Sequence, residues 1–477
     1  MTFQYKLAKS FKLVYKYMQE AIMINNNLEK FYELRNLYPV FIFKNYEINN
    51  LDTYYEIDYY YSINNQIDFC NTIKIQKKKF KYSTDINSNY IKNIIFNLGI
   101  VEGISYYKTT CSPIYKIECG TLDSYQKDWW QKLIYNGLGE LRYVNGFSEM
   151  PMKEFIIIEA LEDNTDNKIP EEITKNFKGN LIPIGGGKDS IVTLELLKKY
   201  NNAPFMFFHK RVASYETCFT YGFKNQDIFE IDRYLDDDML EMNKKGYING
   251  HVPISAMIAF SSYLAAVLLG KKYIVLSNEA SSNEGNIPGT NINHQYSKSF
   301  EFESDFNNYV TKYFSKDIQY FSLLRPISEY QITKQLAKYP KYFPIFKSCN
   351  AGIKENKWCC KCSKCLFVYS LLLPIIGEEK TIKIFNSNLL NDIELNDIFE
   401  KLIGIQCEKP FECVGTKEEI LFGLKTYIKN NNKLPILLEK HKEYIENYNI
   451  SINFNTYFNN ENLVPKEYLK ILEKEIL

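Results

Sequence analysis

The sequence has almost no net charge. Its 477 residues include 58 lysines and arginines against 57 aspartates and glutamates, which leaves a formal charge of +1. A protein attracts nucleic acid or an anionic membrane through a basic surface field, and this composition supplies no such field. We therefore expect no nucleic acid and no membrane among its partners, and no segment indicates an obligate protein partner.

The sequence also lacks a secretory signal and a membrane span. Residues 1–18 are basic and amphipathic but contain neither a continuous apolar core nor a small-residue cleavage site, which is typical of a surface helix. The uncharged run 252–270 is interrupted by Pro253, by serines and by Tyr263, so we expect a buried helix there. Eleven cysteines in so long a chain are not a small disulfide scaffold. Together these features predict a cytoplasmic protein.

A disordered composition is absent as well. Hydrophobic residues make up 45% of the chain, which is long enough for more than one domain. Residues 1–150 show helical patterning mostly within the first thirty and then alternate β-forming and polar residues, so we expect a β-rich N-terminal domain with an antiparallel sheet. Residues 151–380 are expected to form the catalytic domain. Residues 381–477, with Ile and Leu at helical spacing, are expected to form a helical C-terminal region.

Residues 180–200 read as a short apolar strand, a glycine turn and an amphipathic helix. Gly185, Gly186 and Gly187 allow positive φ angles and leave no Cβ to block an anion, and the helix that follows directs its positive dipole end at the turn. Lys188 and Ser190 add a cation and a hydroxyl. The pattern predicts a phosphate site. It is not the Walker A pattern, because its glycines are contiguous and Asp189 separates the lysine from the hydroxyl.

Strands and helices alternate after this turn. Apolar strands are expected at 204–209 and 273–277, separated by an acidic helical region and the buried helix. This order predicts an α/β fold with a doubly wound parallel sheet. Because ligands lie beyond the carboxyl ends of such strands, we expect residues 185–190, 209–211 and 277–286 to line one cleft.

The hexapeptide Gly185 to Ser190 resembles the PP-loop of the ATP pyrophosphatase superfamily, which has an adenine nucleotide alpha hydrolase-like fold and is usually written S-G-G-x-D-S. Those enzymes cleave ATP between its α and β phosphates and transfer AMP to an oxygen of the substrate. The resemblance implies that ATP and Mg²⁺ are required. It implies that the three glycines, Lys188 and Ser190 hold phosphates and that Asp189 helps to position Mg²⁺ or caps the turn.

Cys349, Cys359, Cys362 and Cys365 have the spacing C-x9-C-x2-C-x2-C. Four thiolates so placed can surround one tetrahedral Zn²⁺ and leave no open position, so we expect a structural zinc. Cys360 could replace a neighbouring ligand, an Fe–S cluster would use the same thiolates, and buried free cysteines are the other alternative. The 7-deazaguanine synthases, which are related PP-loop enzymes, carry a similar four-cysteine zinc knot, and this favours zinc.

Several motifs in the same order resemble the MurL-type UDP-N-acetyl-α-D-muramoyl-L-alanyl-L-glutamate epimerases of peptidoglycan synthesis. They lie between about residues 129 and 415 and read NGHVP (249–253), SNE (277–279), NEGN (283–286), NHQYSKSFEFE (293–303), YFSLLRP (320–326), SCN (348–350), WC (358–359) and KPFECVG (409–415). The resemblance implies an ATP- and Mg²⁺-dependent inversion of the terminal L-glutamate of UDP-MurNAc-L-Ala-L-Glu to D-glutamate, through an acyl-adenylate and with release of AMP and pyrophosphate.

Adenylation explains why an epimerase would need ATP. The Cα–H next to an ionised carboxylate is a very weak acid, because the carbanion would lie beside an existing negative charge. Conversion of the carboxylate to an acyl-adenylate removes that charge and lets the carbonyl accept the electron pair. A base then removes the proton from one face, an acid returns a proton on the other, and hydrolysis releases the product.

Roles can be suggested for the polar residues of these motifs. Glu279 follows a strand end and would bind Mg²⁺ or act as a base, or it is a capping or ion-paired carboxylate. His294 lies in a polar stretch that favours a site. Cys413 would transfer a proton as a thiolate, although a single buried cysteine is the interpretation that we favour. The expected catalytic residues are Asp189, Glu279, His294 and Lys298; the ATP-binding residues also include Lys210 and Arg211; the substrate-binding residues are Asn278, Asn293 and Arg325.

Two other functions fit parts of the sequence. The first is another PP-loop adenylating enzyme that modifies a transfer RNA base or forms an amide or nitrile as the 7-deazaguanine enzymes do; the missing basic stripe argues against RNA. The second is an inactive nucleotide sensor or scaffold, against which the intact glycine turn argues.

Overall fold

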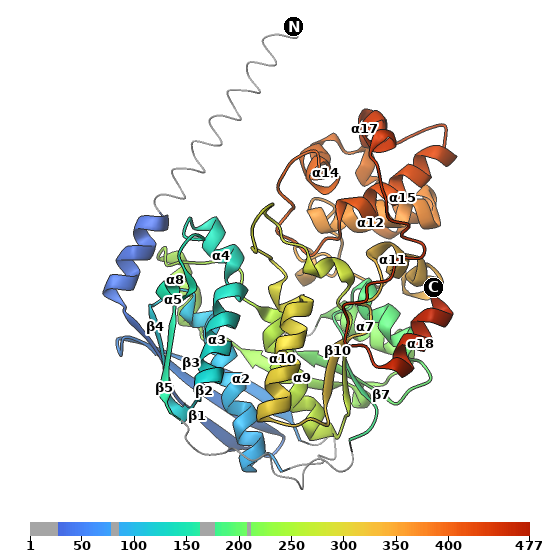
Figure 1. Ribbon diagram of the computed structural model, residues 1–477. Coiled ribbons are helices and arrows are strands. Elements are labelled where there is room, and N and C mark those ends of the chain that lie inside the picture. The colour runs from blue at the N-terminus through green and yellow to red at the C-terminus, as the bar shows by residue number, and fades with distance from the viewer. Residues whose placement is uncertain (1–26, 78–84, 163–176, 208–210) are drawn as a thin grey trace.

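The computed structural model describes residues 27–77, 85–162, 177–207 and 211–477 (Figure 1). The protein is a mixed α/β molecule with one ten-stranded sheet in the order β10-β9-β6-β7-β8-β3-β2-β1-β4-β5. The strands are β1 (Val40–Asn50), β2 (Tyr54–Ile63), β3 (Ile67–Gln76), β4 (Ile114–Thr121), β5 (Ile157–Leu161), β6 (Asn180–Pro183), β7 (Asn202–Phe207), β8 (Phe229–Tyr234), β9 (Tyr273–Leu276) and β10 (Gln319–Ser322).

The N-terminal half of the sheet contains the expected antiparallel strands. β1 pairs with β2 and β2 with β3, both antiparallel, while β4 and β5 add to β1 in parallel. Helical residues 27–37 and α2 (Asn89–Tyr107) pack on these strands. The expectation that helix is mostly confined to the first thirty residues is wrong, because α2 is 19 residues long. Almost all of its side chains are buried, so it lacks the amphipathic stripe by which a surface helix is recognised.

The sheet does not divide at residue 150. β3 pairs antiparallel with β8, in the register Thr72 to Tyr234, and so joins the N-terminal strands to the second half of the sheet. One of the two apolar cores of the described residues contains side chains from both halves of the sheet, from Phe31 to Tyr320. The division at residue 150 implied two separate sheets, but the described chain forms one. β8 pairs with the open edge of β3 and satisfies its backbone hydrogen bonds.

The other half of the sheet, β10-β9-β6-β7-β8, is parallel throughout. β6, β7 and β9 lie where strands were expected, and the uncharged run forms the buried helix α9 (Ile254–Leu269), which Gly270 ends in a left-handed conformation. β8 was not anticipated, since its charged sequence FEIDRY lacks an apolar run. The chain leaves β8, returns past β7 and places β9 on the other side of β6. A crevice forms where strand order reverses in this way.

Helices cover the sheet and build the C-terminal region (Figure 1). Helices α2, α3 (Ser124–Gly137), α9 and α10 (Phe300–Tyr313) lie over one face, and a helical layer drawn in orange and red gathers at one end. The expected helical region is present, but it begins before residue 381, with α11 (Glu329–Ala337) and α12 (Ser363–Ile376). Among the described residues, no helix is long and apolar enough to cross a membrane. The remaining helices are α4 (Gly139–Val144), α5 (Met152–Phe155), α6 (Lys188–Leu196), α7 (Val212–Tyr221), α8 (Asp237–Lys244), α13 (Glu378–Phe385), α14 (Asn396–Leu402), α15 (Lys417–Asn430), α16 (Ile436–Lys440), α17 (Lys442–Asn447) and α18 (Lys466–Glu475).

Candidate functional site

The glycine turn, residues 185–190, connects β6 to α6. Gly186 has a φ of +76°, and a Cβ there would lie 2.7 Å from the backbone of Ala213 and Ser214 at the start of α7. Gly187 precedes α6, and the Ser190 hydroxyl donates to its carbonyl oxygen at 3.1 Å. A Cβ on Gly185 would meet no atom within 4 Å. The turn is therefore tight against α7 on one side and open on the other.

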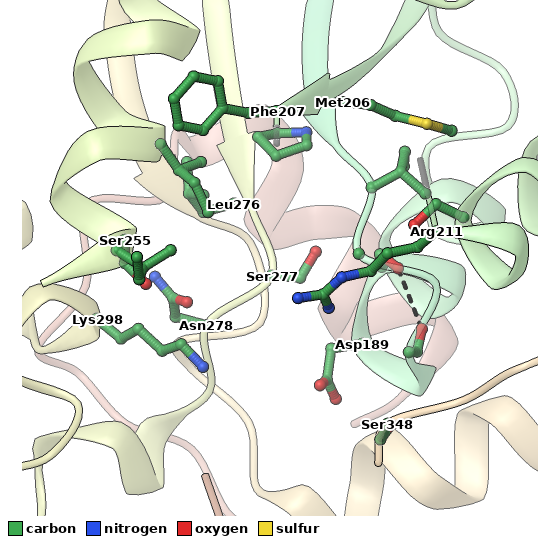
Figure 2. A pocket seen from close by; sticks show the side chains of 18 of the residues that line it. Asp189, Met206, Phe207, Arg211, Ser255, Leu276, Ser277, Asn278, Lys298 and Ser348 are labelled. Carbon is green, nitrogen blue, oxygen red and sulfur yellow. Dashed lines mark hydrogen bonds between the residues drawn. The ribbon is translucent and has the colours of Figure 1, made fainter. Parts of the chain in front are cut away.

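A cleft of about 260 Å³ lies beyond the carboxyl ends of β6, β7 and β9 (Figure 2). The first turns of α6, α7, α9 and α12 all contribute residues to its wall. A helix start carries the positive end of the helix dipole. Four such starts around one cleft favour the binding of an anion there.

Charged side chains add to this field. The cations in the wall are Arg211, Lys298, Lys347 and Lys364, and the carboxylates are Asp189 and Glu279. In Figure 2, Arg211, Lys298 and Asp189 point into the same open space from different elements. A site with an excess of cations and two carboxylates suits a polyphosphate accompanied by a divalent cation, because phosphate oxygens take the cations and the metal takes carboxylate oxygens.

Lys188 does not face the cleft as expected. Its side chain is only 3% exposed and forms ion pairs with Asp189 and with Glu329 of α11. Burial disfavours the ammonium, but Asp189, Glu329 and Glu279 outweigh burial and raise the pKa of Lys188, so this side chain remains charged. In this conformation its ammonium is paired with the buried carboxylate of Glu329 and fixes the position of Asp189, and its role as a phosphate ligand stays a prediction.

Two expected substrate-binding residues, Arg325 and Asn293, make hydrogen bonds within the protein. The Arg325 guanidinium is fully buried and donates to the carbonyl of Glu279 at 2.9 Å, to the carbonyl of Lys298, and to the Glu303 carboxylate at 3.0 Å. The Asn293 amide donates to the carbonyl of Ser282 at 2.9 Å, and its oxygen accepts from the backbone of Gln295 at 2.7 Å. Neither side chain lines the cleft. Through these hydrogen bonds, Arg325 and Asn293 brace the loops that carry Glu279 and Lys298.

The other expected residues divide between the cleft and its surroundings. Gly185, Gly187, Asp189, Ser190 and Arg211 line it, as do Asn278, Glu279 and Lys298; Gly186, Lys188 and His294 stand behind its wall. The Asn278 amide donates to the Ser322 hydroxyl at 3.1 Å, which holds the end of β9 against β10. Lys210 lies outside the described residues.

His294 and Lys298 belong to a second polar cluster that adjoins the cleft, which we call the thiol cluster: Glu140, His251, His294, Lys298 and Cys413. The Lys298 ammonium donates to the Cys413 sulfur at 3.0 Å, and His294 Nδ1 hydrogen-bonds with the Glu140 carboxylate. The His251 and His294 rings are 4.2 Å apart. One carboxylate, two imidazoles, an ammonium and a thiol in contact can hold and transfer protons.

The charges in the thiol cluster shift its pKa values in opposite directions. Burial disfavours the imidazolium of His294, but hydrogen bonds with Cys413 and Glu140 raise its pKa to about 9. Burial, together with the nearby charges of His294, Lys298 and Lys108, lowers the pKa of His251 to about 3. Burial disfavours the Cys413 thiolate, yet Lys298, Lys364 and His294 hold its pKa well below the usual value. At neutral pH, the cluster therefore contains a charged His294, a neutral His251 and a thiolate.

The four expected cysteine ligands come together. The sulfurs of Cys349, Cys359, Cys362 and Cys365 all lie within 4.8 Å of one another, with Cys349 to Cys362 at 3.9 Å and Cys359 to Cys365 at 3.7 Å. Tetrahedral zinc with Zn–S bonds of ~2.3 Å requires sulfur separations of ~3.8 Å. The donor set therefore fits Zn²⁺.

Backbone amides and Cys360 agree with a metal site. Gly352 N–H donates to the Cys349 sulfur at 3.2 Å and Lys361 N–H to the Cys359 sulfur at 3.5 Å, as amides do around metal-bound thiolates. Cys360 turns away with a φ of +58° and donates to the Phe385 carbonyl at 3.4 Å. It is therefore outside the ligand set in this conformation.

Sequence reasoning gave no role to Lys347, Ser348, Asn350 and Lys364, which also line the cleft. They flank Cys349 and Cys365 in the chain. Their position in the sequence was a usable signal, because a cluster of four cysteines also fixes the residues next to each cysteine. What the sequence did not reveal is that the cluster lies against the glycine turn.

Comparisons with known proteins point to one family. A family model described as the MurL N-terminal domain matches residues 33–323, and one described as the MurL C-terminal domain matches residues 345–447. Three similar proteins bear the name UDP-N-acetyl-alpha-D-muramoyl-L-alanyl-L-glutamate epimerase. That of Xanthomonas oryzae pv. oryzae is 32% identical over 341 residues, 70% of this chain and 74% of its own. The protein of Salinispora tropica is 31% identical over 342 residues, which are 69% of this chain and 71% of its own. The protein of a Micromonospora species is 31% identical over 339 residues, which are 69% of this chain and 73% of its own. No solved structure matches the chain.

Proposed function

The chain belongs to the MurL epimerase family, and from this premise we propose that it is an ATP-dependent enzyme that inverts the terminal L-glutamate of UDP-MurNAc-L-Ala-L-Glu to D-glutamate. The family resemblance of the motifs between residues 129 and 415 is thereby confirmed. Peptidoglycan precursor synthesis follows from the substrate that the relatives' name states.

One observation supports the ATP requirement: four helices begin at the cleft beside the glycine turn. We assign this turn to the PP-loop type and the cleft to ATP. Backbone amides of Gly185 to Ser190 and the cations Arg211, Lys347 and Lys364 would bind phosphate oxygens. The nucleotide-binding part of the sheet would then be the doubly wound parallel half, with ATP at the reversal of strand order between β6 and β9.

The reaction proceeds in three steps. A glutamyl carboxylate oxygen attacks the α phosphorus of ATP, the bond between the α and β phosphates breaks, and pyrophosphate leaves. The acyl-adenylate then loses its α proton, because its carbonyl can accept the electron pair, and gains a proton on the opposite face. Water finally attacks the acyl carbon and releases AMP and the D-glutamyl product.

Two metals fit the residues present. Asp189 and Glu279 offer carboxylate oxygens to Mg²⁺ at the phosphates, where the ion would neutralise charge on pyrophosphate as it leaves. The four cysteines would hold a structural Zn²⁺ with no open position. Because Cys349 and Cys365 adjoin Ser348, Asn350 and Lys364, this zinc site would shape the cleft without taking part in the reaction.

The test is incubation with UDP-MurNAc-L-Ala-L-Glu, ATP and Mg²⁺ in deuterated water, followed by chiral analysis of the glutamate and an assay for AMP. We expect deuterated D-glutamate together with AMP, and neither when ATP is omitted. AMP without inversion would retain the adenylation chemistry and point to another carboxylate substrate. Inversion without ATP would refute the adenylate mechanism.

A further inference from the structure

Lys298 belongs to two sites at once. It lines the ATP cleft, and its ammonium donates to the Cys413 sulfur at 3.0 Å. Lys364, which also lines the cleft, is a second cation whose charge acts on this sulfur. The thiol therefore lies next to Lys298 of the cleft wall, with the charge of Lys364 close by, and both lysines would face an anion bound in the cleft.

The loop that carries Cys413 is held firmly in this place. The Asn286 amide donates to the carbonyl of Pro410 at 2.8 Å, and the Lys409 backbone N–H donates to the carbonyl of Asn286 at 3.2 Å. At the other side of the thiol, the Glu412 carboxylate accepts from the backbone N–H of Lys364 at 2.7 Å. Bonds to both flanks fix the thiol between the 286–298 segment and the start of α12.

His294 occupies the other side of the thiol. Its backbone N–H donates to the Asn286 side-chain oxygen at 2.8 Å, so the same asparagine positions both the imidazole and the cysteine loop. The ring hydrogen-bonds with Glu140 through Nδ1 and also with Cys413. A carboxylate, an imidazole and a thiol thus form a chain along which a proton can move away from sulfur.

The protonation states favour sulfur as the proton acceptor. Burial disfavours the ammonium of Lys298, but the charges of Cys413 and Glu279 raise its pKa, so Lys298 is a cation and not a base. His294 is likewise charged at neutral pH. The groups that face Cys413 are the cations Lys298, Lys364 and His294, with Glu412 and Glu140 beyond them. Of the three side chains in contact, Lys298, His294 and Cys413, the Cys413 thiolate is therefore the one that can accept a proton.

We propose that the Cys413 thiolate is the base that removes the α proton of the adenylated glutamyl residue. The inference rests on the proposed function and adds the identity of the base to it. Lys298 would hold the acyl oxygen of the adenylate. Because Cα is bonded directly to the acyl carbon, ~1.5 Å away, the thiolate beside Lys298 would be within reach of its hydrogen.

The Cα–H bond breaks, an S–H bond forms, and the electron pair moves into the acyl group to give an enolate whose charge Lys298 stabilises. A proton that originates from solvent is added to the opposite face of Cα as the enolate pair returns. The charged His294 then releases a proton to solvent through Glu140 and takes the proton from Cys413, which restores both the imidazolium and the thiolate.

The test compares the wild type with Cys413→Ser and, as a matched control, Cys119→Ser, a half-buried cysteine on β4 away from the cleft. Two readouts are measured with UDP-MurNAc-L-Ala-L-Glu, ATP and Mg²⁺ in deuterated water. One is ATP–pyrophosphate exchange with labelled pyrophosphate, which reports adenylation. The other is deuterium incorporation at the glutamate α carbon, which reports proton transfer. Thermal unfolding checks that each variant folds.

We expect Cys413→Ser to retain ATP–pyrophosphate exchange and to lose deuterium incorporation by about 10²–10⁴-fold, the usual contribution of a general base. Cys119→Ser should match the wild type in both. Deuterium incorporation at the wild-type rate in Cys413→Ser would overturn the assignment. Loss of both activities in a folded Cys413→Ser would also overturn it, since the thiol would then serve to position Lys298 for adenylation. A wild type without ATP–pyrophosphate exchange would refute the proposed function itself.

Discussion

Gly187 and Ser348 face each other at the edge of the cleft: a Cβ on Gly187 would lie 3.0 Å from the Ser348 hydroxyl oxygen. Next to this contact, the backbone N–H of Lys347 donates to the carbonyl of Gly186 at 2.9 Å. The segment that leads into Cys349 is therefore packed against the glycine turn. The shape of the turn depends on the cysteine cluster, although the two are more than a hundred and fifty residues apart in the chain.

The first prediction concerns this dependence. Cys362→Ser removes one of four thiolates, so zinc should fall from close to one per chain to near zero, with a loss of local folding energy on the order of 10 kcal/mol. ATP affinity should weaken as well, because Ser348 and Lys364 lose their anchor. Metal analysis and calorimetric titration with ATP measure the two effects. Cys360→Ser is the control and should keep its zinc; substoichiometric metal in a stable wild type would contradict the site.

The second prediction separates backbone strain from steric clash in the glycine turn. Gly186 and Gly246 have similar φ angles, +76° and +80°, but a Cβ would be 2.7 Å from the α7 backbone at Gly186 and would meet nothing within 4 Å at Gly246. Both alanine variants should lose about 1–2 kcal/mol of stability to the left-handed conformation. Only Gly186→Ala should also lose ATP affinity, because α7 must move. Equal ATP affinities would show that the close approach is irrelevant to the ligand.

The third prediction tests Asp189. Its carboxylate lines the cleft and is fixed by the buried Lys188. Asp189→Asn keeps the shape but removes the charge, so ATP-dependent turnover should fall by about 100-fold or more, as when an electrostatic catalytic group is lost. Asp238→Asn, a change at the exposed first turn of α8, is the matched control and should be neutral. Turnover of the Asp189 variant at the wild-type rate would remove this carboxylate from the mechanism.

The fourth prediction concerns pH. The pKa of His294 is about 9, raised from 6.5 because its bonds with Cys413 and Glu140 outweigh burial. A raised pKa stabilises the folded state fully below pH 6.5, and this stabilisation is lost as the pH rises through about 9. The difference in unfolding free energy between the wild type and His294→Gln should therefore shrink across that range in denaturant titrations.

His441 provides the opposite control for this titration. Burial lowers its pKa, so its charged form opposes folding and its effect appears as the pH falls. His441→Gln should thus relieve destabilisation at acidic pH and show no change around pH 9. A pH-independent difference for His294→Gln would mean that His294 does not carry the proton in the folded state.

Much of the candidate site was predictable because its signals are local. The strand, glycine turn and helix around Gly186 follow from conformational freedom and apolar spacing within twenty residues, and the four cysteines from ligand spacing. The buried helix α9 follows from an uncharged run that ends in glycine. Family membership follows from motifs in a fixed order, and the comparisons confirm it.

Residue roles were less predictable, because they depend on which partners a side chain meets. Lys188 and Arg325 have the charge that suits phosphate or carboxylate, but both are taken up by buried carboxylates, Glu329 and Glu303, from other elements. Cys413 looked like an isolated buried cysteine, since the lysine and histidine that change its chemistry come from a segment over a hundred residues earlier.

The sequence by itself determined the glycine turn, the spacing of the four cysteines, the α/β character and the family. These are properties of short segments, in which backbone preference, spacing and periodicity act directly. The tertiary structure alone decided that β3 pairs with β8 to make one sheet, that four helix starts surround one cleft, and that Lys298 lies between this cleft and Cys413. The physical reason is that burial and charge pairing depend on contacts between distant segments, and those contacts determine which ionisable groups are charged and which face the ligand.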